Sequence, residues 1–144
     1  MSGDGNKLKT NDSTVLGNLN EAEGNNLDIS GNQNMLKGNN SKIIGSDNIL
    51  IGSDNIVIGS KNNNTGSQNN IEGQENTVGG DVNNVKGNIN TVLGFQNNVA
   101  GDINKVYGDK NNVTGNENKI NGDLNNVKGN INVVKGSENN LEGN

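Results

Sequence analysis

The sequence has no cysteine, histidine, proline or tryptophan, and among its 144 residues it has one phenylalanine and one tyrosine. Without Cys and His, disulfide scaffolding, Cys/His metal sites, thiol catalysis and imidazole acid–base chemistry are unavailable. With 27% apolar residues, the chain also lacks the large buried side chains on which most enzyme folds depend. We therefore expect a protein that is not an enzyme.

A basic face and a long apolar run are missing as well. The formal net charge is −5, and phosphate binding needs a basic face, so we expect no nucleic-acid partner. No stretch approaches the roughly eighteen apolar residues of a membrane span, and residues 1–6 contain no apolar signal-peptide segment. We expect a soluble chain with no membrane partner and no signal peptide in this sequence; its compartment stays unknown.

What the sequence does have is a seven-residue repeat. Glycine occupies every seventh position from Gly17 to Gly143. Extended backward, the frame meets Thr10, so residues 4–143 divide into 20 heptads of the form x-x-N-x-φ-x-G, where φ is aliphatic. The third residue is Asn in 17 heptads, and the fifth is aliphatic in 19, with Asn64 as the exception. We interpret residues 1–144 as a single repeat domain with its repeat region at 4–143.

The repeat favours strands over a coiled coil. A glycine in each heptad would cost a helix about 1 kcal/mol relative to alanine. In a strand, by contrast, the third and fifth residues point to the same side, and glycine suits the turn that follows. Each heptad is therefore predicted to be one short strand followed by a glycine turn.

Charged residues indicate how many heptads make one coil. Like charges stacked about 4.8 Å apart on adjacent coils repel each other. At a separation of two heptads we count eight opposite pairs and two like pairs, whereas separations of one heptad and of three heptads favour like pairs. The prediction is an all-β fold, a β-solenoid (β-roll) with two seven-residue strand–turn units per 14-residue coil, about ten coils, two parallel sheets and no caps.

The third-position asparagines are expected to point inward, where an unpaired amide would cost about 1–3 kcal/mol. We predict that each amide bonds its equivalent in the next coil and the turn backbone beside the glycine, so that the asparagines have a structural role. This structural ladder comprises Asn48, Asn55, Asn62, Asn69, Asn76, Asn83, Asn90, Asn97, Asn104, Asn111, Asn118, Asn125, Asn132 and Asn139.

Segments such as residues 76–80 (NTVGG) and 90–94 (NTVLG) carry a resemblance to a known family. Across residues 4–143 the pattern resembles that of the ryegrass-type ice-recrystallisation-inhibiting antifreeze proteins, which implies a left-handed roll of two heptads per coil. It also implies ice as a partner, bound by outward residues at the fourth and sixth places, and slightly favours an extracellular location. The candidate ice-face residues are Thr77, Thr91, Asn70, Asn84, Asn98, Asn112, Asn126 and Asn140. Residues 45–59 are less closely similar to the head repeats of trimeric autotransporter adhesins.

Exposed aliphatic residues and the two ends of the roll indicate self-association. Eleven residues are predicted to form an assembly or lateral interface, the last six of them on one sheet: Ile44, Ile49, Ile51, Ile56, Ile58, Ile89, Leu93, Ile103, Tyr107, Ile131 and Val133. Bare solenoid ends carry unpaired backbone groups, and basic Lys7 and Lys9 could meet acidic Glu138 and Glu142 head to tail. The leading hypothesis is a structural protein that stacks end to end into a filament. Ice binding is the alternative, and an adhesin-like or scaffolding module is a third possibility.

Four turns of the form G-D-x-N resemble calcium-binding repeat turns but lack the G-G-x-G-x-D signature. Asp after Gly is explained by hydrogen bonds that its carboxylate accepts from the backbone of its own turn. We therefore expect no metal site, no cofactor and no calcium.

Overall fold

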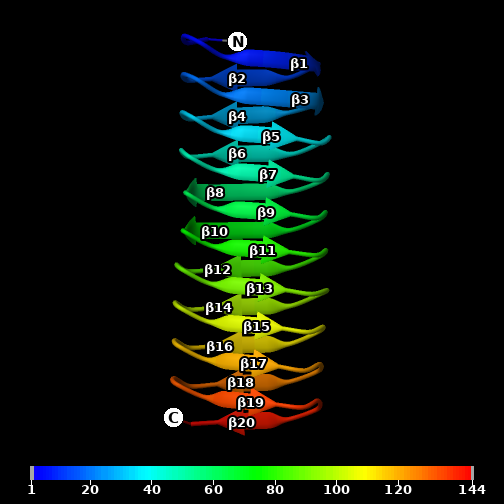
Figure 1. Ribbon diagram of the computed structural model, residues 1–144, viewed down its shortest axis with the longest axis vertical. Coiled ribbons are helices and arrows are strands. Elements are labelled where there is room, and N and C mark those ends of the chain that lie inside the picture. Colours follow the sequence, from blue (N-terminus) through cyan, green and yellow to red (C-terminus); the bar gives the residue numbers. More distant parts are fainter. Residues whose placement is uncertain (1, 144) are drawn as a thin grey trace.

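The computed structural model describes residues 2–143, which form one continuous stack of coils (Figure 1). Twenty strands build two ten-stranded parallel sheets, one from the odd-numbered strands and one from the even-numbered strands. We call them the odd sheet and the even sheet. Coil 1 is residues 4–17, and each later coil is the next pair of heptads, up to coil 10 at residues 130–143. No helix lies in residues 2–143, so this part of the chain has no helix that could span a membrane.

The strands are short, and they begin at the fourth residue of each heptad. The odd sheet contains β1 (Lys7–Asn11), β3 (Glu21–Asn25), β5 (Met35–Lys37), β7 (Ile49–Ile51), β9 (Asn63–Thr65), β11 (Thr77–Gly79), β13 (Thr91–Leu93), β15 (Lys105–Tyr107), β17 (Lys119–Asn121) and β19 (Val133–Lys135). The even sheet contains β2 (Thr14–Leu16), β4 (Asp28–Ser30), β6 (Lys42–Ile44), β8 (Ile56–Ser60), β10 (Asn70–Gln74), β12 (Asn84–Lys86), β14 (Asn98–Ala100), β16 (Asn112–Thr114), β18 (Asn126–Lys128) and β20 (Asn140–Glu142).

Neighbouring strands of a sheet pair in register at a separation of two heptads, as in Thr77↔Thr91 on β11 and β13. The predicted coil of two heptads and the two parallel sheets are thereby confirmed. Four of the opposite charge pairs counted at this separation form ion pairs: Asp28–Lys42, Lys61–Glu75, Glu72–Lys86 and Lys128–Glu142. All eight side chains are well exposed, so each pair contributes little to stability.

The core is a single file of aliphatic side chains from each sheet, contributed by the fifth residue of every heptad. Val85, Val92, Val99 and their equivalents in the interior of the stack are buried, whereas Leu8 and Leu141 at its two ends are partly exposed. β-branched side chains suit the narrow space between the sheets. Asn64 occupies the same place on β9 and is also fully buried, so its predicted inward position is confirmed.

Glycine ends every heptad after the first, which ends in Thr10. Where another coil follows, the coils stack too closely at these glycines for any side chain. At Gly101 the backbone has φ +126°, in the left-handed region that favours glycine. A Cβ atom at this position would collide with the carbonyl oxygen of Gly115, one coil further on. The expected positive φ is confirmed, and the close stacking is a second reason for glycine.

The second residue of each heptad lies at a corner of the roll, and its backbone is also left-handed. Nineteen such residues that are not glycine have φ between +50° and +62°. This corrects the placement of Ile89, Ile103 and Ile131 on a sheet surface: all three lie in the turns that lead into the next strand. The alternation of inward and outward residues holds only inside a strand, and the strand begins two residues after the corner.

A ladder of buried asparagines runs beside the odd sheet through the whole described chain. Asn76 is typical, because its Nδ2 donates to Asn62 Oδ1 (3.0 Å) and to the carbonyl oxygen of Gly87 (2.8 Å). The backbone N–H of Asn76 donates to the same Asn62 Oδ1 (3.0 Å). The predicted bonding of the asparagine ladder, to the next coil and to the glycine turn, is confirmed.

The matching ladder beside the even sheet is less regular. Ser13 and Ser41 replace asparagine, and their hydroxyls accept the backbone N–H of Leu27 (3.0 Å) and Asn55 (3.1 Å). In coil 5, Asn69 Nδ2 donates to Asn64 Oδ1 (3.0 Å), where the usual acceptor would be the asparagine one coil back. Asn64 Nδ2 is buried without a hydrogen-bond partner.

The aspartates that follow glycine form another ladder on the outside of the turns. Asp109 Oδ1 accepts the backbone N–H of Phe95 (2.8 Å), and Asp123 Oδ1 accepts the backbone N–H of Asp109 (2.7 Å). The expectation that these carboxylates bond within their own turn is wrong, because stacking brings each of them beside an N–H of the preceding coil. Within residues 2–143, no three or more acidic side chains are grouped so that they could hold a metal ion.

Candidate functional site

The roll presents two flat outer faces, each made of the fourth and sixth residues of successive heptads. The predicted ice-face residues do not share one of them. Thr77 and Thr91 lie on the odd sheet, on β11 and β13, whereas the six asparagines from Asn70 to Asn140 lie on the even sheet. The two faces therefore have to be compared as separate candidate sites.

On the even face, the stacked asparagines bond one another. The Nδ2 of Asn84 donates to Asn98 Oδ1 (3.0 Å), and the Nδ2 of Asn98 donates to Asn112 Oδ1 (2.9 Å). The same bond repeats from Asn70 to Asn140. The neighbouring sixth positions carry the ion pairs Glu72–Lys86 and Lys128–Glu142. The longest uncharged stretch of this face is two adjacent strands.

On the odd face, four consecutive strands, from β7 to β13, have no charged outward residue. We call this surface the uncharged face. It consists of Ile49, Ile51, Asn63, Thr65, Thr77, Gly79, Thr91 and Leu93. Within residues 2–143, the hydroxyls of Thr65, Thr77 and Thr91 have no hydrogen-bond partner. These hydroxyls can donate and accept bonds outside the chain.

The one position without a side chain on this face is covered by its neighbour. A Cβ atom at Gly79 would lie 2.8 Å from Leu93 Cδ2, so the Leu93 side chain leans over the glycine of the preceding coil. The paired strands hold the rows in register through Thr77↔Thr91 and Gly79↔Leu93. The uncharged face is therefore a regular surface, with rows repeating at about the 4.8 Å spacing of paired strands.

The eleven residues predicted as an assembly interface are spread over several surfaces. Ile49, Ile51 and Leu93 belong to the uncharged face, whereas Ile44, Ile56 and Ile58 lie on the even face. Tyr107 and Val133 lie on other strands of the odd sheet, and Ile89, Ile103 and Ile131 are corner residues. Their use as an interface stays a prediction.

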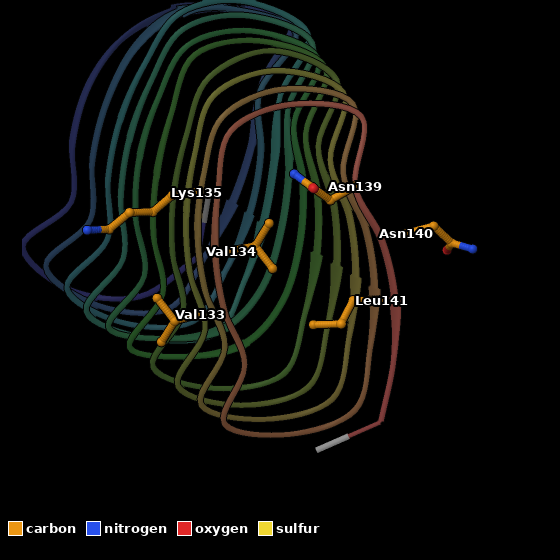
Figure 2. Close-up of a pocket in the computed structure, with 6 residues that line it drawn as sticks. All are labelled: Val133, Val134, Lys135, Asn139, Asn140 and Leu141. Carbon is orange, nitrogen blue, oxygen red and sulfur yellow. The ribbon is translucent and has the colours of Figure 1, made fainter.

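The predicted end contacts lie at opposite ends of the roll (Figure 1). Lys7 and Lys9 are on β1, Glu138 is a corner residue of coil 10, and Glu142 on β20 receives a bond from Lys128 Nζ (3.0 Å). Figure 2 shows a shallow pocket in coil 10, where Val134 and Leu141 point toward each other from the two sheets. Leu141 is 38% exposed, whereas its equivalent one coil earlier is fully buried.

One clear signal of the uncharged face in the sequence was missed. Reading only threonines in register picks out Thr77 and Thr91 and overlooks Thr65, which lies at a sixth rather than a fourth position. Reading the fourth and sixth residues of every second heptad together, and asking where charge is absent, would have found the whole surface.

Comparison with known proteins agrees with this architecture. The family model described as grass antifreeze beta roll matches residues 1–87 and, in an overlapping second match, residues 71–144. No curated protein matches the chain. Because the two matches together cover every residue, and because the resemblance noted in the repeats points the same way, the chain belongs to the grass antifreeze β-roll family.

Proposed function

We propose that this protein binds ice through the uncharged face of the odd sheet, and thereby slows ice recrystallisation without catalysing a reaction. The family supports ice as the partner. The observation that carries the choice of face is the run of four adjacent strands whose outward residues are all uncharged, with three threonine hydroxyls that have no partner in residues 2–143.

Charge is the first reason to prefer this face. A charged side chain holds its own water strongly, and removing or rearranging that water is costly. The even face carries Glu72, Lys86, Lys128 and Glu142 beside its asparagines. The uncharged face has no such groups over coils 4–7, so water against it is free to adopt the arrangement of a crystal surface.

Hydrogen-bonding capacity is the second reason. On the even face each central asparagine donates to one neighbour and accepts from the other, which reduces what it can offer to water. The hydroxyl of Thr77 or Thr91 can both donate and accept, and the adjacent methyl group disfavours disordered water. Rows of such groups at a constant spacing offer hydrogen-bonding positions that repeat regularly, as the water positions in an ice crystal do.

Rigidity is the third reason. The residues between the outward ones, Leu50, Asn64, Val78 and Val92, are all buried. The asparagines that precede each strand, such as Asn76, are bonded from coil to coil. The face is thus held in place before it meets ice, and little conformational freedom is lost on binding.

The test compares one double variant on each face. Thr77→Glu with Thr91→Glu places two carboxylates in adjacent coils of the uncharged face, next to Lys105. Ala100→Glu with Thr114→Glu does the same on the even face, between Lys86 and Lys128. Grain growth in annealed frozen solution is measured against protein concentration, and circular dichroism checks the fold.

We expect the wild type to stop grain growth at micromolar concentration. The odd-face variant should need at least about ten times more protein, equivalent to about 1.4 kcal/mol of binding free energy. The even-face variant should stay within about twofold of the wild type. Loss in the even-face variant alone would assign ice binding to the asparagine ladder, and normal grain growth with the wild type would refute the proposed function.

End-to-end stacking into a filament stays a separate prediction, which the family does not address. It is checked by particle length in negative-stain electron microscopy over a concentration series. Isolated short rods at every concentration would count against it.

A further inference from the structure

The corner position of the heptad carries an unusual set of side chains. Polar residues or glycine occupy 14 of the 20 corners, including Asn26, Asp47 and Gln96. Six corners carry an aliphatic residue: Leu19, Val82, Ile89, Ile103, Leu124 and Ile131. A left-handed backbone is tolerated by Gly, Asn and Asp, whereas it is a clear outlier for a β-branched residue.

Within residues 2–143, no buried contact or special hydrogen bond accounts for isoleucine at two of these corners. Ile89 has φ +58° and Ile103 has φ +61°, and their side chains are 51% and 45% exposed. Their backbone N–H groups donate to the carbonyl oxygens of Gln74 and Asn88 (both 2.9 Å). Polar corners make the same backbone bond, so it does not require isoleucine. Strain without burial points to a role outside the chain.

Ile89 and Ile103 occupy adjacent coils along one edge of the odd sheet: Ile89 precedes the last strand of the uncharged face, and Ile103 lies one coil beyond it, before Lys105. Ile89 precedes Thr91 by two residues and leads directly into β13. In coil 7, the outward residues from the corner across the odd sheet are Ile89, Thr91 and Leu93, all uncharged. In coils 5 and 6, the same corner instead carries the ion pair Lys61–Glu75 (3.6 Å).

Asp102, the one charged residue between the two isoleucines in the sequence, is bonded to the neighbouring coils. Asp102 Oδ1 accepts the backbone N–H of Asn88 (2.7 Å) and its Nδ2 (3.1 Å). The backbone N–H of Asp102 in turn donates to Asn116 Oδ1 (2.7 Å). Because the carboxylate is bonded along the stack, it interrupts the apolar edge less than a free charge would.

We propose that Ile89 and Ile103 form an apolar rim of the ice-contacting surface. This inference rests on the proposed function of the uncharged face. When that face meets ice, the rim releases water from exposed methyl groups and widens the contact beyond the three-residue strands. The strained corners would then be kept for binding at the expense of stability.

The test replaces both isoleucines by a residue that the corner prefers. Ile89→Asn with Ile103→Asn relieves the left-handed strain and removes the apolar rim. We expect the melting temperature to rise by about 2–4 °C for each residue replaced, while the concentration needed to stop grain growth rises by about threefold to tenfold. Ile89→Gln with Ile103→Gln, using a residue native to corners 33, 68 and 96, should lose potency in the same way.

The matched control is Ile131→Asn, which changes the same residue type at the same corner of the same edge, three coils from Ile89 and two from Ile103. It should raise the melting temperature and leave ice activity unchanged. Full ice activity in both rim variants would overturn the rim while the proposed function stands, provided that Thr77→Glu with Thr91→Glu loses activity. A wild type without ice activity would overturn both. An equal loss of activity in the Ile131 control would also overturn the assignment, because it would show that position along the edge is irrelevant.

Discussion

The even and odd faces of this roll have the same kind of interior behind them and differ in their outward residues. On the even face, six stacked asparagine amides bond one another and ion pairs flank them. On the odd face, the hydroxyls of Thr65, Thr77 and Thr91 have no partner within residues 2–143. The same repeat thus builds both sheets. The outward residues, at the fourth and sixth places of the heptad, decide whether the polar groups of a face bond one another or stay available to the surroundings.

Both faces depend on the glycine turns, so a single turn change should break them together. Gly101→Ala would place a methyl group against the carbonyl oxygen of Gly115 at a φ of +126°. We expect the free energy of unfolding to fall by about 4 kcal/mol or more, which is the range of the most destabilising single substitutions. Denaturant unfolding monitored by circular dichroism measures it.

Gly136→Ala is the control for that experiment. Gly136 also has a left-handed φ, of +103°, but the atom nearest to an added Cβ would be Asn139 Nδ2 at 3.8 Å. Its cost should be limited to the backbone strain, about 1–2 kcal/mol. Equal losses in the two variants would show that φ, and not coil stacking, makes glycine necessary.

Asn64, whose buried Nδ2 has no hydrogen-bond partner, lies behind the uncharged face and can be replaced without changing an outward residue of either face. Asn64→Val removes the buried Nδ2 that has no partner and frees Asn69 Nδ2 to bond Asn55, as its equivalents do in other coils. We expect a gain of about 1–3 kcal/mol, seen as a higher melting temperature, with ice activity retained. An unchanged or lower melting temperature would contradict the account of this defect.

The difference in hydrogen bonding between the two faces can be measured with two substitutions that keep the shape of the side chain. Asn98→Asp removes the donor to Asn112 Oδ1 (2.9 Å) and should cost about 1 kcal/mol. Thr91→Val removes a hydroxyl that has no partner in the described chain and should change stability by less than about 0.5 kcal/mol. Equal effects in thermal unfolding would mean that the even ladder contributes nothing to stability.

Much of the fold could be predicted because the repeat leaves few alternatives. The glycine period, the Asn and aliphatic residues two apart, and opposite charges two heptads apart together specify strands, turns and coil size. The corners could not be predicted, because a left-handed backbone at Ile89 contradicts local propensity and is imposed by stacking. The same holds for Asp109, whose acceptor role depends on an N–H one coil away.

The candidate site was predicted only in part. Thr77 and Thr91 were identified from their register, but the outward asparagines were grouped with them as candidates although they lie on the opposite face. The register of threonines does not find Thr65, and the sequence predicts Ile49, Ile51 and Leu93 as part of an assembly interface. The candidate site is defined by the absence of charge over four adjacent strands, and a search for one residue type in register does not detect that.

By itself, the sequence determined the coil, the two sheets and the inward ladder of asparagines, because a strict period of seven forces each residue type to one place in every turn. Only the tertiary structure decided which polar groups are satisfied. Whether an amide, a carboxylate or a hydroxyl finds a partner depends on atoms two heptads away along the chain but one coil away in space, and hydrogen bonds form only at short distances and suitable angles.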